Sequence, residues 1–330
     1  MAVLCVFFAH LYEIASGHRS EVGWHFAQMG VLIFFVHTSM VLMLSLERAR
    51  SEGAALFGSF YLRRFFRLYP LSMFCVALAF VLAASPHPGE FVRHWTTGEL
   101  VSNLALTINL TYTDEMVGGI WTLPLEVQMY VMLPFLYLAC RAAPVRRVAV
   151  LWLACLALGL LQPHVSQRLD VFAYAPCFVA GVLAWRLSRS THRRLPGWLW
   201  PAAFAATWPV FLVATREANI YYRWAFCLTL GLAIPWFQEL RFRPLVQSTK
   251  LVAKYSYGIY LSHVGIMVFL FRLPLPALAQ WSALAVLAIL CPVAMYHLIE
   301  HPMIQAGQRA ASRLFGRSTA ASASAPSLVA

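Results

Sequence analysis

Charged residues are scarce in this chain. Asp, Glu, Lys and Arg make up 12% of its 330 residues, whereas a soluble domain carries roughly 25%. No stretch is polar enough to form a soluble domain. Long apolar runs recur along the whole length instead, which is typical of a polytopic membrane protein.

Paired cysteines are also missing. The seven cysteines lie far apart, mostly in apolar runs, and they form no C-x-x-C motif and no Cys/His ligand spacing. A disulfide framework and a structural zinc site are therefore not expected. We predict no metal site and interpret the cysteines as small buried apolar side chains.

The apolar runs predict an all-α membrane protein with about ten spans. A span needs about 20 residues. The expected spans are 2–16, 26–46, 69–85, 124–140, 148–162, 171–187, 197–214, 224–239, 256–272 and 278–297. The moderately apolar run LVSNLALTINLTY, at 100–112, is expected to be a re-entrant or interfacial piece on the outer side. We expect one membrane-embedded domain over 1–305 and a disordered cytoplasmic tail over 306–330.

The basic residues predict how the chain is oriented. With the N-terminus in the cytoplasm, all but six of the 25 Lys and Arg residues fall on the inner side; the six are Arg19, Arg93, Arg168, Arg216, Arg223 and Arg272. This agrees with the positive-inside rule. Both termini are therefore expected in the cytoplasm. The net charge of +12 then reflects membrane orientation, and no nucleic-acid partner is predicted.

A few polar side chains lie inside the apolar runs, where a charge costs at least about 2.5 kcal/mol. They are His10, Glu13, His37, Glu126 and His263, with His297 and Glu300 at the inner end of the last span. Intramembrane polar groups at this cost are expected to have a function.

His10 and Glu13 are three residues apart and share a helical face. A carboxylate in that place can fix the imidazole tautomer and raise its basicity, as in a general-base pair. Two alternatives stay open. The first is that His10 is a neutral core histidine. The second is that Glu13 simply faces water at the outer interface.

The segment FGSFYLRRFFRLYPLS carries Arg64 and Arg67, which share a face if the segment is helical. Arginine forks bind phosphate bidentately, so the pair predicts a clamp for an anionic cytosolic donor. The alternative is a basic anchor on an amphipathic interfacial helix. Pro70 is expected to mark the start of the third span.

In GGIWTLPLEVQMYVMLPF, Gly118 and Gly119 loosen the backbone before Trp121. Glu126 is expected to enter the membrane from the outer side, apart from the arginine pair. The alternative is a carboxylate at a helix N-terminus, favoured there by the helix dipole.

Taken in order, these segments resemble the acyltransferase-3 family of integral membrane enzymes, which O-acylate cell-surface carbohydrates and related molecules. VFFAH resembles the first-span segment that ends in the family's essential His. GVLIFFVHTSMVLM resembles the second-span pattern, LRRFFRLYP resembles RxxR-x-x-P, and WTLPLEVQMYVMLP resembles WSLxVExxFYxxLP. YSYGIYLSH and LIEHP resemble the closing motifs. Each match alone is weak, but six in order along nearly the whole chain are a strong signal.

The resemblance implies roles for individual residues. The catalytic candidates are His10, which corresponds to the family's catalytic histidine, Glu126, which falls at a characteristic motif position, and Glu13, which is a candidate from its spacing to His10 alone. The donor-binding candidates are Arg64 and Arg67. The further candidates are His37, Trp121, Tyr260 and His263.

The implied activity is transfer of an acyl group, expected to be acetyl, from cytosolic acyl-CoA. The acceptor would be a hydroxyl of a carbohydrate or lipid-linked glycan, in the inner (plasma) membrane of the cell. No tightly bound cofactor is implied. The partners are acyl-CoA, the glycan acceptor and the lipid bilayer.

The chain departs from the family pattern in two informative places. The family carries an Arg about eleven residues before its His, and that position would precede Met1, so we expect the natural start to lie upstream. HTSM, at 37–40, replaces the usual Ser-Gly region. Two alternative functions stay open: a transporter or flippase, since intramembrane His and Glu suit proton coupling, and a catalytically inactive family member.

Overall fold

The computed structural model describes residues 2–18, 21–49, 51–83, 95–191, 194–206 and 220–315. Within these ranges the chain is helical and contains no β-strand, apart from an isolated bridge between Leu195 and Phe237. The all-α prediction is confirmed.

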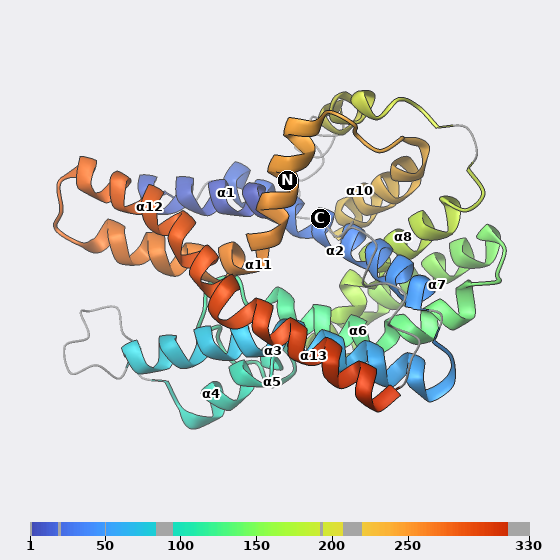
Figure 1. Ribbon diagram of the computed structural model, residues 1–330, viewed down its shortest axis with the longest axis horizontal. Helices are drawn as coiled ribbons and strands as arrows, with labels where there is room; N and C mark the ends of the chain where they lie inside the picture. Colours follow the sequence, from blue (N-terminus) through green and yellow to red (C-terminus); the bar gives the residue numbers. More distant parts are fainter. Residues whose placement is uncertain are drawn as a thin grey trace.

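Long helices make up most of this part of the chain (Figure 1). They are α1 (Ala2–Ser16), α2 (Glu21–Ala49), α3 (Gly53–Ala83), α6 (Thr122–Cys140), α7 (Val145–Val165), α8 (Val171–Leu187), α10 (Ile220–Ala233), α11 (Arg243–Arg272), α12 (Ala277–Met295) and α13 (His301–Phe315). The shorter elements are α4 (Thr97–Leu104), α5 (Ile108–Thr111), the 3₁₀ helices η1 (Gln167–Leu169), η2 (Gly197–Leu199) and η4 (Ile234–Trp236), and the π-helix η5 (Tyr296–Glu300).

Six helical stretches among the described residues are long and apolar enough to cross a membrane. They are α2, α3, α6, α7, the run from η1 through α8, and the run from α12 through α13; α1 is apolar but shorter. The chain is therefore a multi-pass membrane protein in its architecture. Of the other expected spans, 256–272 lies within α11 and 224–239 is taken up by α10 and η4. The second half of the expected span 197–214 lies outside the described residues.

Helix α3 begins earlier than the sequence indicated. The span was expected to start at 69, with Pro70 at its boundary, but the helix begins at Gly53 and continues through Pro70. In an apolar phase a broken helix leaves backbone groups without partners, so continuing past a proline is favourable. The consequence is that Arg64 and Arg67 lie in the middle of a long helix, on the shared face that their spacing predicted.

The run at 100–112 forms two short helices, α4 and α5, rather than a single long one. Thr96 and Glu99 close a capping box at the start of α4, and Leu106 and Tyr112 adopt positive φ values of 55° and 56°. Neither helix is long enough to cross a membrane. The prediction that this run is not an eleventh span is confirmed.

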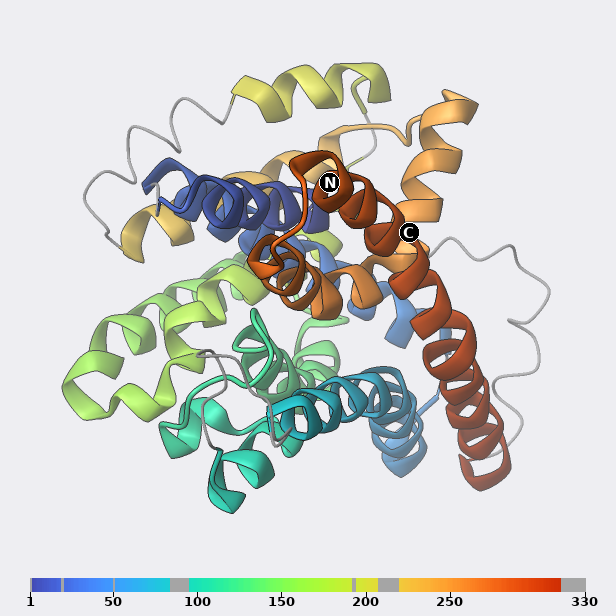
Figure 2. The ribbon, with the colours of Figure 1, turned by 90° about the vertical axis from the view of Figure 1, so that its left-hand side faces the viewer.

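The disordered tail was expected to begin at residue 306, but the chain is still helical there. Helix α13 continues to Phe315, and Figures 1 and 2 show it running beside α3. Gly307 lies directly against Phe66, and Gly58 lies against the Phe315 ring, so a Cβ at either glycine would collide with its neighbour. Small residues here let the two helices approach closely. Residues 316–330 lie outside the described ranges.

A tightly packed apolar core is built around α8, which is buried along most of its length between α2, α7 and α10. Phe35 of α2 stacks on Phe178 of α8, with ring centroids 4.3 Å apart. A second core surrounds α3 and α6. Apart from His37 on α2, the polar side chains that the sequence singled out lie beside these cores, where α1, α3, α6 and η5 approach α11.

Candidate active site

Helices α1 and α11 bring two histidines close together, with their rings tilted by 48°. The ring centroids of His10 and His263 are 5.3 Å apart. His263 is buried, whereas His10 is half-buried. The Phe7 and Tyr260 rings each lie 6.1 Å from His263. Two candidates that are 253 positions apart in the sequence therefore form one group, called the histidine pair below.

Glu13 lies beside His10, as the spacing predicted. Its Oε2 is 3.7 Å from His10 Nδ1, which is beyond hydrogen-bond distance but close enough for electrostatic attraction. The carboxylate therefore faces Nδ1. This leaves Nε2 as the nitrogen of His10 that is free to take part in chemistry.

The tautomer of His263 follows from its hydrogen bonds. Its Nδ1 lies 3.0 Å from the Ile259 carbonyl oxygen and 2.8 Å from that of Tyr260. Carbonyl oxygens only accept, so Nδ1 carries the proton and donates. The buried Nε2 of a neutral ring is then an acceptor, and it finds no hydrogen-bond partner among the described residues.

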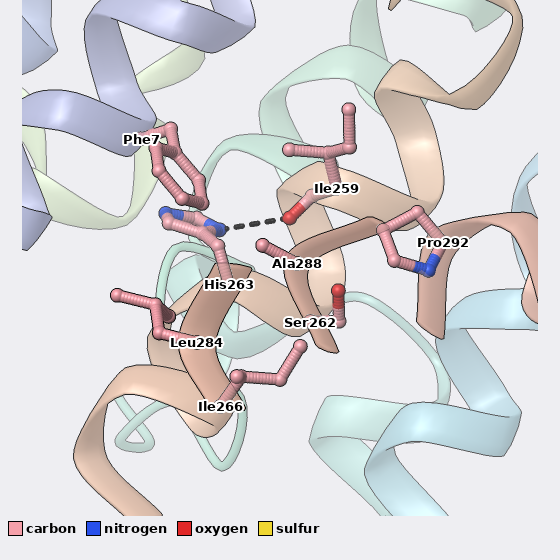
Figure 3. Close-up of a pocket in the computed structure, with 8 residues that line it drawn as sticks. All are labelled: Phe7, Ile259, Ser262, His263, Ile266, Leu284, Ala288 and Pro292. Carbon is pink, nitrogen blue, oxygen red and sulfur yellow. Dashed lines mark hydrogen bonds between the residues drawn. The ribbon is translucent and has the colours of Figure 1, made fainter. Parts of the chain in front are cut away.

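A small apolar cavity adjoins the histidine pair (Figure 3). Its space is too narrow for a water molecule. Its lining comes from α1, α11 and α12: Phe7, Ile259, Ser262, His263, Ile266, Leu284, Ala288 and Pro292. The only side-chain hydroxyl in this lining, that of Ser262, already donates to the Gly258 carbonyl at 2.8 Å.

The arginine pair lies in a second group. Arg67 Nη1 is 2.7 Å from Oε1 of Glu300, whose side chain is completely buried at the end of η5. The sequence marked Glu300 as a polar residue at the end of a span and as part of LIEHP, but assigned it no role. Its partnership with Arg67 depends on the packing of η5 against α3, which no spacing in the sequence encodes.

Glu126 belongs to this second group. It is buried in α6 and accepts a hydrogen bond from the Tyr130 hydroxyl. The positive charges of Arg64 and Arg67 both act on its carboxylate. The expectation that Glu126 lies apart from the arginines is therefore wrong, because α6 packs directly against α3. The guanidinium of Arg64 also lies 6.0 Å from the centre of the Phe60 ring.

Helix α11 connects the two groups with three side chains spaced three residues apart. Tyr257 donates to the Leu68 carbonyl in the arginine helix at 2.7 Å. Tyr260 donates to the Gly119 carbonyl at 2.5 Å, and its hydroxyl is 2.6 Å from Thr122 Oγ1. His263 comes next and meets His10. Successive members are separated by roughly 4.5 Å along the axis, so a line of polar groups, called the α11 seam below, runs from the arginine group to the histidine pair.

The double glycine before α6 has a structural purpose. Gly119 has φ +87°, which a residue with a side chain rarely adopts, and a Cβ on Gly118 would lie 2.5 Å from Val264 of α11. Glu115 accepts hydrogen bonds from the N–H groups of Gly119 and Trp121, at 3.2 and 3.4 Å. This turn therefore presents the Gly119 carbonyl to the α11 seam.

Two of the further candidates lie outside both groups. The Trp121 ring packs 6.0 Å from Tyr174 of α8, and His37 lies on an exposed face of α2. Within HTSM, Ser39 is the residue that packs inward. It is completely buried, donates to the Phe35 and Val36 carbonyls, and meets Gly181 of α8. The unusual segment therefore serves the contact between α2 and α8.

The fold and the site together define an all-α, multi-pass membrane protein with a polar site enclosed between its helices. A family model described as an acyltransferase domain, that of acyltransferase family 3, matches residues 1–297. The chain belongs to the acyltransferase-3 family, and is thus a membrane acyltransferase in kind. Comparisons with curated proteins and with solved structures found no match.

Proposed function

We propose that this protein transfers a short acyl group, acetyl in the first instance, from acyl-CoA to a hydroxyl of a carbohydrate or lipid-linked glycan. The observation that carries the proposal is the α11 seam, which joins a group containing two arginines to a pair of histidines. An acyl transferase needs both parts: one to hold an anionic donor and one to move a proton at the reacting carbonyl.

The arginine group suits an anionic donor, with one qualification. Arg64 and Arg67 are balanced by the carboxylates of Glu126 and Glu300. A phosphate group that approaches Arg67 must compete with Glu300. Donor binding is therefore proposed to loosen the Arg67–Glu300 pair, which would couple donor arrival to a change at the end of η5.

The histidine pair suits proton transfer to and from an acceptor hydroxyl. In the direct route, His10 Nε2 takes the hydroxyl proton as the oxygen attacks the thioester carbonyl. The C–S bond then breaks, and the departing CoA thiolate takes the proton back from His10. In the second route, His10 Nε2 attacks the thioester carbonyl and CoA leaves as the thiolate. The acceptor hydroxyl then attacks the acyl-imidazole, its proton passes to the thiolate, and His10 is released. Both routes use the same nitrogen, because Glu13 faces Nδ1.

His263 supports either route as a hydrogen-bond acceptor. Its Nε2 is buried and has no hydrogen-bond partner among the described residues. A hydrogen bond from the acceptor hydroxyl, or from the N–H of a protonated His10, would satisfy it.

The direction across the membrane follows from the basic residues. With the arginine end of the seam toward the cytoplasm, as the positive-inside rule indicates, acyl-CoA arrives from the side where it is made. The acceptor then meets His10 from the opposite side. We propose that the protein lies in the inner (plasma) membrane and that its product is an O-acetylated glycan of the cell envelope.

The test is to incubate membranes containing the protein with radiolabelled acetyl-CoA and to follow label into the glycan fraction. Wild-type protein is expected to transfer label, and His10→Ala to lose transfer. His164→Ala is the matched control, because His164 lies on the exposed end of α7. Equal transfer by His10→Ala and wild type contradicts the role of His10, and absence of any acetyl transfer by wild-type protein contradicts the function.

A further inference from the structure

Another group of aromatic and basic side chains lies where the N-terminal half of α11 meets η5 and the start of α13. It consists of Lys254, Tyr255, Tyr296, His297 and His301 and is called the aromatic cluster below. No step of the proposed chemistry uses it. Its members come from α11, η5 and α13, so the fold rather than one short motif assembles it.

The cluster presents ring faces together with a positive charge. Lys254 Nζ lies 4.8 Å from the centre of the Tyr296 ring and 5.1 Å from that of Tyr255. The two tyrosine rings meet edge to face at 5.3 Å. His301 stacks on the opposite part of the group, with its ring 5.4 Å from Tyr296 and tilted by 27°. Lys254 and His297 are exposed.

The hydrogen bonds leave one donor available. Gln305 Nε2 is 2.8 Å from His301 Nε2, and an amide nitrogen only donates, so that ring nitrogen accepts. A neutral His301 then carries its proton on Nδ1 and donates to the Tyr296 hydroxyl, 3.3 Å away. The hydroxyl hydrogen of Tyr296 is therefore free to point toward an incoming acceptor atom.

The backbone connects this cluster to the arginine group. Tyr296 begins the π-helix η5 and Glu300 ends it, and Glu300 is the partner of Arg67. Short π-helical segments are rare and occur often at functional sites. On α11, Tyr255 lies two residues before Tyr257, which bonds to the arginine helix. A ligand on the cluster would thus lie about one helical turn from Arg67.

The surroundings are strongly basic. From residue 240 to the end of the sequence the one acidic residue is Glu300, which is buried, whereas Lys254 and Arg309 are exposed. Exposed cations with aromatic faces between them favour a ligand that combines phosphates with a flat ring.

We propose that the aromatic cluster binds the phosphorylated adenosine end of the CoA donor. The adenine ring stacks against the tyrosine and histidine faces, and Lys254 with the Tyr296 hydroxyl contacts phosphate oxygens. The pantetheine arm then passes Arg67 and follows the α11 seam to the histidine pair. From Tyr255 to His263 this is roughly 12 Å of helix axis. The inference rests on the proposed function, in which acyl-CoA is the donor.

The first experiment compares two donors, acetyl-CoA and acetylpantetheine, which lacks the nucleotide. Lys254→Ala and Tyr296→Leu are each expected to raise KM for acetyl-CoA about tenfold, the equivalent of one lost contact of about 1.4 kcal/mol. Both variants should leave kcat and all kinetics with acetylpantetheine unchanged. Lys250→Ala is the matched control, since it removes the same charge from the exposed face of α11 one turn away.

The second experiment does not depend on catalysis. Binding of adenosine 3′,5′-bisphosphate to purified protein in neutral detergent should be about tenfold weaker for Lys254→Ala than for wild type and for Lys250→Ala. If Lys254→Ala binds the bisphosphate as wild type does and loses binding only to vesicles that contain anionic lipid, Lys254 is an ordinary membrane anchor. That result would overturn the inference. Equal changes with both donors would also overturn it, because they indicate general disturbance of packing.

The outcomes also separate this inference from the proposed function. If wild-type protein transfers acetyl from acetyl-CoA while the cluster variants behave like wild type, only the inference fails. If wild-type protein binds the bisphosphate but transfers no acetyl group from either donor, the proposed reaction fails and the nucleotide site stands.

Discussion

The contact between α2 and α8 and the contact between α1 and α11 are built on opposite principles. At the first, Gly181 lies so close to α2 that an added Cβ would come within 2.1 Å of the Val36 carbonyl oxygen, and large apolar side chains fill the remaining space. At the second, the rings of His10 and His263 lie 5.3 Å apart, and the buried Nε2 of His263 has no hydrogen-bond partner among the described residues. The comparison shows a closely packed apolar scaffold beside a polar region in which a buried hydrogen-bond acceptor has no partner among the described residues.

The largest effect is expected from filling the scaffold contact. In Gly181→Leu the new side chain would collide with Val36 and Ser39, so α2 and α8 must separate. Folded protein should be almost absent, and activity should be lost with it. Size-exclusion chromatography of detergent extracts measures the folded fraction. Gly265→Leu is the control, because nothing lies within 4 Å of a Cβ there; equal yields of the two variants would contradict the close contact.

The second effect is on activity alone. His10→Ala is expected to reduce acetyl transfer by about 10²- to 10⁴-fold, the usual contribution of a general base, because its ring is the one that faces both Glu13 and His263. The folded fraction should stay near that of wild type, since His10 is only half-buried. Transfer rates normalised to folded protein check this. If His10→Ala loses folded protein as well as activity, His10 also supports the packing and the predicted contrast with the scaffold is wrong.

The third prediction concerns the buried ion pair. Arg67→Ala leaves the Glu300 carboxylate buried without a cation, which costs about 3–5 kcal/mol. Adding Glu300→Gln removes the stranded charge and should recover most of the thermal stability, while donor binding stays weak. Thermal unfolding in detergent, read beside KM for acetyl-CoA, separates the two effects. If the double variant is no more stable than Arg67→Ala, the two residues do not interact as described.

A smaller effect is expected at His263. His263→Asn keeps a polar side chain on α11 but removes the imidazole ring that lies 5.3 Å from the His10 ring, so kcat should fall about tenfold. KM for acetyl-CoA should stay unchanged, since the arginines that we propose to bind the donor lie at the other end of the seam. A change in KM without a change in kcat would argue for a purely structural role.

The smallest effect is expected at Glu13. Its carboxylate is 3.7 Å from His10 Nδ1 and partly exposed, so the interaction is weakened by solvent. Glu13→Gln should lower kcat only about two- to threefold. Steady-state rates check this, and a loss comparable with that of His10→Ala would show that Glu13 takes part directly in the chemistry.

Much of this architecture could be predicted from the sequence. The bounds of α1 and α8 agree with the expected spans, because short polar segments interrupt the apolar runs there. The start of α3 could not be predicted, since a proline in an apolar environment does not end a helix as it does in water. His10, Arg64 and Arg67 were found from motifs. The partnerships of His10 with His263 and of Arg67 with Glu300 depend on helices more than 200 positions apart, which local spacing cannot reveal.

The central claim is that donor binding and proton transfer occupy opposite ends of the α11 seam. The most direct test measures CoA binding and acetyl transfer for the same two purified variants, His10→Ala and Arg67→Ala. The account predicts that His10→Ala binds CoA with the wild-type Kd and transfers acetyl at least about 100-fold more slowly, whereas Arg67→Ala binds CoA more weakly. Wild-type transfer by His10→Ala, or wild-type CoA affinity in Arg67→Ala, would contradict it.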